Sequence, residues 1–192
     1  MLNESAPPGK ELKYARVERE RRFLLAELPS QPSIRDVQIT DRYLIGTRLR
    51  LREAIETNPK PGDVQYKLTQ KIPDPAGRPG LITTLYLSEA EYQVLTALPA
   101  RILRKVRHSI PPFGVDAFEG ALLGLYLAEA EFTTDAESAE FSPPAFAIAE
   151  VTSDPRFTGG YFVTTDREDV NGAMAEFGLT LLQAAEQPKR AI

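Results

Sequence analysis

Short runs of alternating apolar and polar residues recur along this chain, and clusters of Pro, Gly and Asp separate them. Because the side chains of a strand point alternately to two faces, such runs predict β-strands. We expect extended segments at 14–25, 43–52, 65–72, 81–87, 102–109, 114–118, 123–132 and 147–152. The pattern therefore predicts a strand-rich α+β fold.

Prolines and one capping pattern divide these strands. The stretches 58–63 and 73–80 are rich in proline, which is excluded from central strands, and each is predicted to close a hairpin. Ser88 and Glu91 have the spacing of a capping box and predict a helix that ends by Pro99. The apolar face of this helix is predicted to hold Val94, Leu95 and Leu98.

A second helix is predicted over 166–186, where apolar residues that we assign to the core recur at helical spacing: Val170, Met174, Phe177 and Leu181. Residues 1–13 are polar and contain prolines, which predicts a flexible tail. The remaining residues, 14–192, have the length of a single domain.

Composition narrows the classes of function. A hydrophobic share of 42% and a charged share of 26% are typical of a globular protein. No apolar stretch approaches the roughly 20 residues that span a bilayer, and no secretory signal is evident, so we expect a cytoplasmic protein with no membrane partner. The net charge of −4 argues against binding to duplex nucleic acid.

The chain has no cysteine and one histidine, His108. Thiolate metal sites, cysteine nucleophiles and histidine-rich zinc sites are therefore excluded or disfavoured. We expect His108 to be a pairing or packing residue. Catalysis must depend on oxygen and nitrogen groups.

Charged residues two positions apart share a face on several predicted strands: Glu18, Glu20 and Arg22; Arg48, Arg50 and Arg52; Lys67, Thr69 and Lys71; Lys105 and Arg107; Glu129 and Glu131; Glu150 and Thr152. On any single strand this pattern usually marks the solvated side of an antiparallel sheet. Faces of one sign, however, repel unless a counter-ion is present. A sheet closed into a barrel would bring both signs to one lumen, where a polyphosphate and a divalent metal balance them.

The residue types suit those two ligands. Carboxylate oxygens are the ligands that Mg²⁺ and Mn²⁺ prefer, as Glu18, Glu20, Glu129 and Glu131 would supply. Guanidinium groups match phosphate oxygens in pairs, as Arg50, Arg52 and Arg107 would do. The implied reaction is phosphoryl transfer to water.

The segment Glu18-Arg19-Glu20-Arg21-Arg22 resembles the Glu-x-Glu-x-Lys motif of the CYTH family, also called triphosphate tunnel metalloenzymes, with Arg22 in place of the lysine. The resemblance covers about residues 14 to 165. Six further motifs follow in the family's order: Tyr43-Leu44 with Leu49-Arg50-Leu51-Arg52, Leu68-Thr69-Gln70-Lys71, Lys105-Val106-Arg107-His108, Asp116-Ala117-Phe118-Glu119-Gly120, Leu127-Ala128-Glu129-Ala130-Glu131-Phe132 and Glu150-Val151-Thr152-Ser153-Asp154-Pro155-Arg156-Phe157.

This resemblance implies a closed, eight-stranded antiparallel β-barrel, or tunnel, with flanking helices and a C-terminal helix. It implies metal ligands at Glu18, Glu20, Glu129 and Glu131, and phosphate binding by Arg50, Arg52, Lys71, Lys105 and Arg107. We assign possible catalytic roles to Arg22, Tyr43 and Glu150, and leave the roles of Lys67, Asp116 and Arg48 open. Dimers are common in the family, so a homodimer is expected.

Two departures from the family pattern affect the chemistry. Arginine keeps its proton at any workable pH, so Arg22 cannot act as the general base, and water activation would depend on a metal or a carboxylate. Thr83, Thr84 and Tyr86 stand where many members carry glutamates, and 158–160 replaces a usual lysine and asparagine. Fewer ligands favour a single strong metal site.

Three functions remain open on the sequence. The leading one is a hydrolase that uses Mg²⁺ or Mn²⁺ to cleave inorganic tripolyphosphate or an organic triphosphate. The first alternative is a class IV-type adenylyl cyclase, for which no adenine pocket is identified. The second is a non-catalytic protein that binds polyphosphate or nucleotides.

Overall fold

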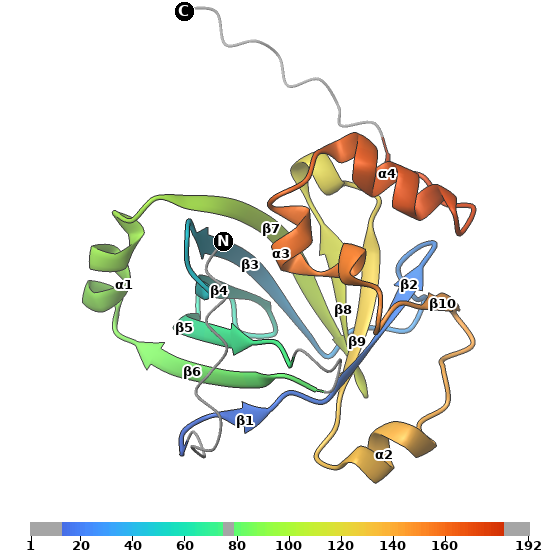
Figure 1. Cartoon of the computed structure of the whole chain (residues 1–192), viewed down its shortest axis with the longest axis horizontal. Helices are drawn as coiled ribbons and strands as arrows, with labels where there is room; N and C mark the ends of the chain where they lie inside the picture. The colour runs from blue at the N-terminus through green and yellow to red at the C-terminus, as the bar shows by residue number, and fades with distance from the viewer. Residues whose placement is uncertain (1–12, 75–78, 183–192) are drawn as a thin grey trace, which may run out of the picture.

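One antiparallel sheet of ten strands dominates the part of the chain that this computed structural model describes, residues 13–74 and 79–182 (Figure 1). The strands are β1 (Arg16–Val17), β2 (Glu20–Leu25), β3 (Arg35–Leu44), β4 (Leu49–Asn58), β5 (Val64–Ile72), β6 (Leu81–Leu87), β7 (Ala100–Ile110), β8 (Phe113–Phe118), β9 (Tyr126–Glu131) and β10 (Ala147–Glu150). Their order across the sheet is β1-β6-β5-β4-β3-β7-β8-β9-β2-β10. The predicted α+β class is confirmed.

The predicted closed barrel of eight strands is not confirmed. The order of the ten described strands has two ends, β1 and β10, because the first extended segment is interrupted at Glu18 and Arg19. The N–H of Glu18 donates to the carbonyl of Gly80 beside β6, and the N–H of Phe132 beside β9 donates to the carbonyl of Arg19, both at 2.9 Å. One short segment therefore connects the two sides of a curved sheet (Figure 1).

The predicted strands differ most from the structure between residues 35 and 52, where β3 (Arg35–Leu44) was predicted only for its last two residues. The single extended run predicted at 43–52 is wrong, because β3 ends at Leu44 and β4 begins at Leu49. Gly46 lies in the turn between them with a φ of 75°, a conformation that glycine adopts at little cost. The turn at 58–63 is confirmed between β4 and β5, and the stretch 73–80 connects β5 to β6, with 75–78 outside the described residues.

Helix α1 (Glu89–Thr96) has the predicted capping box at its first turn. The hydroxyl of Ser88 accepts from the N–H of Glu91, whose carboxylate accepts from the N–H of Ser88 at 2.7 Å. The predicted apolar face is wrong, because Val94 is 74% exposed and Tyr92 is the buried residue. Tyr92 stacks on Tyr66 of β5, and this aromatic contact sets which side of α1 faces the sheet.

The C-terminal helix α4 (Arg167–Ala175) is confirmed but shorter than the predicted 166–186. It ends before Gly178, whose φ is 73°, and residues 183–186 lie outside the described part. Val170 and Met174 are buried as predicted, and Leu181 packs in the same cluster beyond the helix. Helices α2 (Asp135–Glu140) and α3 (Gly159–Phe162) and 3₁₀ turns at Gly120–Leu122 and Pro155–Phe157 complete the fold.

Strand β2 contributes to two hydrophobic clusters on opposite faces of the sheet. Leu24 packs in the cluster that α3 and α4 cover, whereas Phe23 and Leu25 pack in a cluster with Phe113 and Val115 of β8. All three β2 side chains are fully buried. This packing on both faces fixes β2, and with it the charged residues at its N-terminal end.

In the described part of the chain, no helix combines the length and apolarity that a membrane span requires. The flexible tail predicted for 1–13 lies, apart from Lys13, outside the described residues. The single domain predicted for 14–192 stays a prediction.

Candidate functional site

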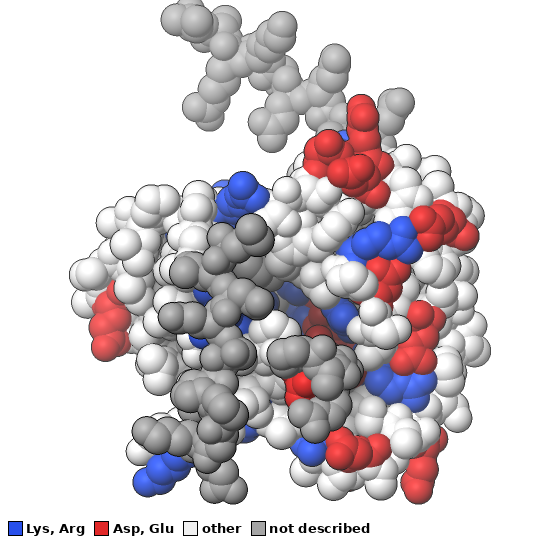
Figure 2. All heavy atoms as spheres, viewed as in Figure 1, with Lys and Arg blue, Asp and Glu red and all other residues white. Residues whose placement is uncertain are grey.

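A cavity of about 1770 Å³ lies on the concave side of the sheet. Figure 2 shows basic and acidic atoms close together in the central hollow of this face. The cavity is lined by every site residue predicted from the sequence except Asp116: Glu18, Glu20, Arg22, Tyr43, Arg48, Arg50, Arg52, Lys67, Lys71, Lys105, Arg107, Glu129, Glu131 and Glu150. The strand alternation seen in the sequence therefore brings these residues to one space.

A buried carboxylate holds the two arginines of β4. Asp41 of β3 is opposite Arg52 in the ladder and accepts two hydrogen bonds from it, from Nε at 2.6 Å and from Nη2 at 2.7 Å. The Nε of Arg50 lies 3.5 Å from the same carboxylate. Burial raises the pKa of Asp41, but Arg52 and Arg50 outweigh it and hold that pKa well below its usual range. Asp41 is thus an anion that orients both guanidinium groups.

A second buried carboxylate organises the basic residues of β7. Asp116 of β8 is fully buried and contacts the Nζ of Lys105. It also accepts two hydrogen bonds from Arg107, both at 2.7 Å. The Nη2 of Arg107 in addition contacts Glu129 of β9. Asp116 lies beneath the cavity lining, so it positions Lys105 and Arg107.

The acidic side of the cavity is formed by residues of β2, β9 and the segment before β2. Lys71 lies 2.6 Å from Glu18 and 3.9 Å from Glu20, measured from its Nζ to the carboxylate oxygens. Burial and the nearby Glu129 and Glu18 raise the pKa of Glu20 to about 7. Glu131 is the ladder partner of Glu20 and is exposed. Burial and the neighbouring carboxylates therefore disfavour the charged form of Glu20.

These carboxylates fit a divalent cation in donor type and in charge. They offer oxygen atoms only, the donors that Mg²⁺ and Mn²⁺ prefer, and a cation would relieve the repulsion that Glu20 experiences. They do not form a ready-made ligand group: the described residues contain no group of three or more His, Cys, Asp or Glu arranged to hold a metal ion. A cation would have to exchange with the Lys71 and Arg107 contacts.

Arg22 points to the segment that follows β10. Its Nη1 donates to the carbonyl oxygen of Phe157 at 2.7 Å and its Nη2 to that of Thr152 at 2.6 Å. Its Nε is buried without a hydrogen-bond partner, 3.8 Å from Glu20. The guanidinium therefore ties β2 to 152–157, while the side chain lines the cavity.

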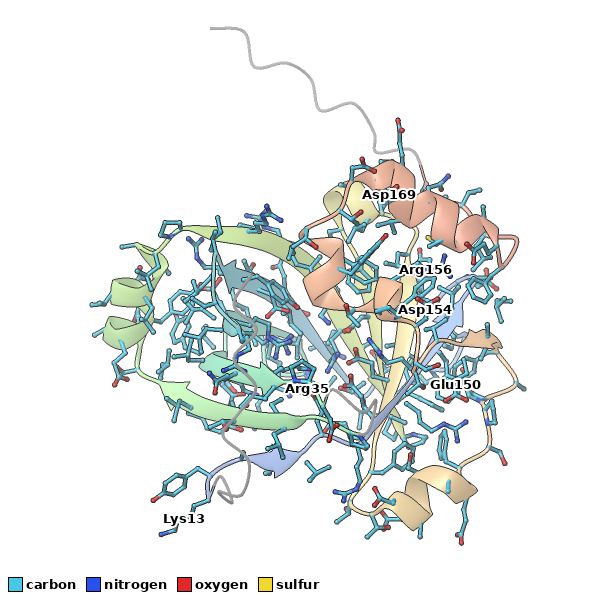
Figure 3. All side chains as sticks on the ribbon, in the orientation of Figure 1. Lys13, Arg35, Glu150, Asp154, Arg156 and Asp169 are labelled. Carbon is cyan, nitrogen blue, oxygen red and sulfur yellow. The ribbon has the colours of Figure 1, made fainter. Side chains whose placement is uncertain are left out.

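The same segment is tied to α4 from its other side. Arg156 donates to Asp154 at the start of its own turn and, through Nη1 and Nη2, to Glu176 at 2.6 and 2.8 Å. Figure 3 shows Arg156 and Asp154 directed toward one another below α4. Arg22 thus holds 152–157 to β2, and Arg156 holds it to the end of α4.

Tyr43 lies against the first residue of α3. A Cβ at Gly159 would be only 2.0 Å from the Tyr43 hydroxyl, so the absence of a side chain at 159 permits this approach. Burial raises the pKa of Tyr43, whereas Arg50 acts in the opposite direction. The 158–160 departure noted in the sequence is therefore sterically linked to the predicted catalytic tyrosine.

Glu150 has its own partners at the edge of the cavity. It accepts from Arg21 at 2.9 and 2.5 Å and from the Thr152 hydroxyl at 2.7 Å. The hydrogen bond from Arg21 lowers its pKa. Glu150 is labelled in Figure 3 on β10, at one side of the curved sheet. The predicted pairing role of His108 is confirmed, because its Nδ1 lies 2.7 Å from Asp36.

Asp41 was not among the site residues predicted from the sequence. Its position two residues before Tyr43, on the face of the buried Val37 and Ile39, was the available signal. A lone acid on an apolar strand face implies a buried cationic partner. Its partner Arg52 is set by the β3–β4 register, which the sequence pattern did not give.

Comparison with known proteins supports the CYTH-like resemblance at the level of the fold. Two crystal structures of the protein NE1496 match with TM-scores of 0.51. One, described as a hypothetical protein, is 26% identical over 78% of this chain and 99% of its own. The other, described as the inorganic triphosphatase NE1496, is 24% identical over 77% and 95%. No protein-family model and no curated protein matches the sequence.

Replacing the buried carboxylate, Asp41→Asn, is expected to lower the free energy of unfolding by about 3–5 kcal/mol, because Arg52 and Arg50 lose their counter-charge in a buried place. Urea denaturation at neutral pH measures this. The matched control Asp135→Asn removes a carboxylate that is 80% exposed and is expected to cost at most about 1 kcal/mol.

The pH dependence of the free energy of unfolding gives a second test of Asp41→Asn. Because the folded-state pKa of Asp41 is lowered, its contribution is fully present above its unfolded pKa of about 4 and is lost as the pH falls below it. The stability difference between wild type and Asp41→Asn should therefore shrink in acid. A difference that is small at neutral pH, or constant with pH, would contradict the assigned role.

Replacing the guanidinium that holds 152–157, Arg22→Met, is expected to speed amide hydrogen exchange in residues 152–163, because two carbonyls lose donors worth about 1.5–3 kcal/mol each. Arg19→Met is the control, since Arg19 pairs with the exposed Asp135. Unchanged exchange in Arg22→Met would show that Arg22 does not anchor this segment.

Proposed function

We propose that the protein is a metal-dependent hydrolase that cleaves a triphosphate bound in the cavity. The observation that carries the proposal is the pair of buried carboxylates, Asp41 and Asp116, each of which holds two basic side chains at the cavity wall. Four cations thus face the cavity over two buried anions, which leaves positive charge for a polyanion. The fold likeness to NE1496, a protein described as an inorganic triphosphatase, supports the choice of a triphosphate.

We assign phosphate binding to the basic residues that line the cavity. The guanidinium forks of Arg50, Arg52 and Arg107 suit phosphate oxygens, and Lys105 and Lys71 add ammonium charges. Their orientation exists before the substrate enters, so little reorganisation is needed when negative charge develops on the leaving diphosphate. In the reaction a water oxygen bonds to the terminal phosphorus as the bridging P–O bond breaks, giving orthophosphate and a diphosphate.

The acidic side of the cavity would hold the metal. Glu18, Glu20, Glu129 and Glu131 are the candidate ligands, and a bound Mg²⁺ or Mn²⁺ supplies charge neutralisation and a lowered pKa of water. The water proton passes to a cavity carboxylate, because Arg22 has no capacity to accept it. The cytoplasmic location and the homodimer stay predictions from the sequence.

A substrate-by-metal screen tests the proposal. Inorganic tripolyphosphate, thiamine triphosphate and ATP are incubated with the protein and Mg²⁺ or Mn²⁺, and released orthophosphate is measured. We expect turnover of at least one substrate, which chelation of the metal abolishes. Arg50→Met should lower kcat/KM by about 10²–10³, the usual effect of removing one charge-stabilising donor.

Two features make Arg50→Met a fair test. Asp41 keeps its two hydrogen bonds from Arg52, so no buried charge is left unpaired. Arg104→Met, on β7 beside Lys105 but outside the cavity lining, is the control and should leave the rate unchanged. No orthophosphate from any substrate would overturn the hydrolase; cyclic AMP from ATP would indicate a cyclase, and binding without turnover a binding protein.

A further inference from the structure

Lys67 is a cavity cation that has no carboxylate partner among the described residues. Lys67 of β5 lines the cavity and is half-buried, and among the described residues no ion pair or hydrogen bond of its Nζ is found. Its Nζ instead lies over the ring of Tyr86 on β6, 5.1 Å from the centroid. Lys71, Lys105 and Arg107, by contrast, each contact an acid.

The neighbours of Lys67 are predominantly cationic. In the ladder it is paired with Arg52 on β4 and with Tyr86 on β6. Lys67 is also repelled by the positive charges of three further arginines: Arg50 of β4, Arg35 of β3 and Arg107 of β7. Partial burial first, and then Arg52 and Arg50, lower the pKa of Lys67.

This arrangement is unfavourable in the absence of an anion. Several guanidinium groups destabilise a nearby lysine ammonium group by Coulomb repulsion. Arginines cannot relieve this repulsion by releasing a proton. Lys67, as a lysine, can release one. Asp41 does not compensate it, because Arg52 and Arg50 already occupy that carboxylate.

We propose that Lys67 binds a phosphate group of the substrate directly and takes up a proton from solvent as the polyanion enters. The amine becomes an ammonium ion that donates to a phosphate oxygen, and no internal ion pair has to break. Binding of the substrate is thereby coupled to pH through one residue. The inference rests on the proposed triphosphate substrate, but it concerns binding and does not require turnover.

The position of Lys67 also suits a residue that neutralises a phosphate of the substrate. Strand β6 presents Thr84 and Tyr86 to the cavity at positions beside β5, and neither is a carboxylate residue. Positive charge from Lys67 is therefore available at this wall for the substrate. A phosphate bound here would bridge β4 and β5 through Arg52 and Lys67.

Calorimetric titration with inorganic tripolyphosphate tests the proposal, with and without Mg²⁺. Each titration is run in two buffers of different ionisation enthalpy, at pH values from about 7 to about 10, the range in which a lysine with a lowered pKa titrates. The difference in heat gives the protons taken up per anion bound. Three variants are compared with wild type: Lys67→Met, Lys67→Arg and the control Lys60→Met in the exposed β4–β5 turn.

The variants separate charge from proton uptake. Lys67→Met should weaken binding by about tenfold, equivalent to about 1.4 kcal/mol, and should lose part of the proton uptake. Lys67→Arg should keep most of the affinity and lose the same uptake, because arginine is already protonated. Proton exchange by tripolyphosphate itself is common to all variants and cancels. Lys60→Met should match wild type.

The outcomes distinguish this inference from the proposed function. Full affinity in Lys67→Met, or unchanged proton uptake in both Lys67 variants, would overturn the role of Lys67 even if the protein hydrolyses triphosphates. Binding with the expected uptake but without turnover would keep the role and remove the hydrolase. Failure of tripolyphosphate to bind wild type in any condition would overturn the role of Lys67, whereas the hydrolase is decided by the substrate screen.

Discussion

The site depends on two buried carboxylates that hold basic side chains at the wall of a cavity. Asp41 and Asp116 are inaccessible to solvent, and each is compensated by a bidentate arginine together with a second cation. A buried anion is tolerated only with such partners, so the strands that carry them must keep their register. Stability and anion binding are thereby linked, since the contacts that neutralise the acids also orient the arginines.

Strand β2 links these charged residues to the rest of the fold. Its alternation places Phe23 and Leu24 in two different hydrophobic clusters, while Glu20 and Arg22 reach the cavity side. Arg22 then holds the segment 152–157 by its carbonyl oxygens. An arginine is suited to this task, because its planar donors satisfy two acceptors at once and never lose their charge. A substrate-binding role for Arg22 would have to share the guanidinium with these contacts.

Much of the site was predictable, because side chains two apart on a strand share a face whatever the tertiary structure. That rule placed Arg50 with Arg52 and Lys105 with Arg107. It could not give the partners: Asp41 faces Arg52 through the β3–β4 register, and Arg22 meets Phe157 through the packing of a distant turn. The same limit explains the fold errors, where a turn glycine divided one predicted strand and a Tyr–Tyr contact reoriented α1.

We propose that the cavity is a preformed site for a triphosphate. A crystal structure of the protein with bound inorganic tripolyphosphate tests it most directly. We expect phosphate oxygens at about 2.7–3.2 Å from the donors of Arg50, Arg52 and Arg107, with Asp41 and Asp116 still paired as described. An anion bound outside the cavity, or one that displaces these arginines from their buried carboxylates, would contradict it.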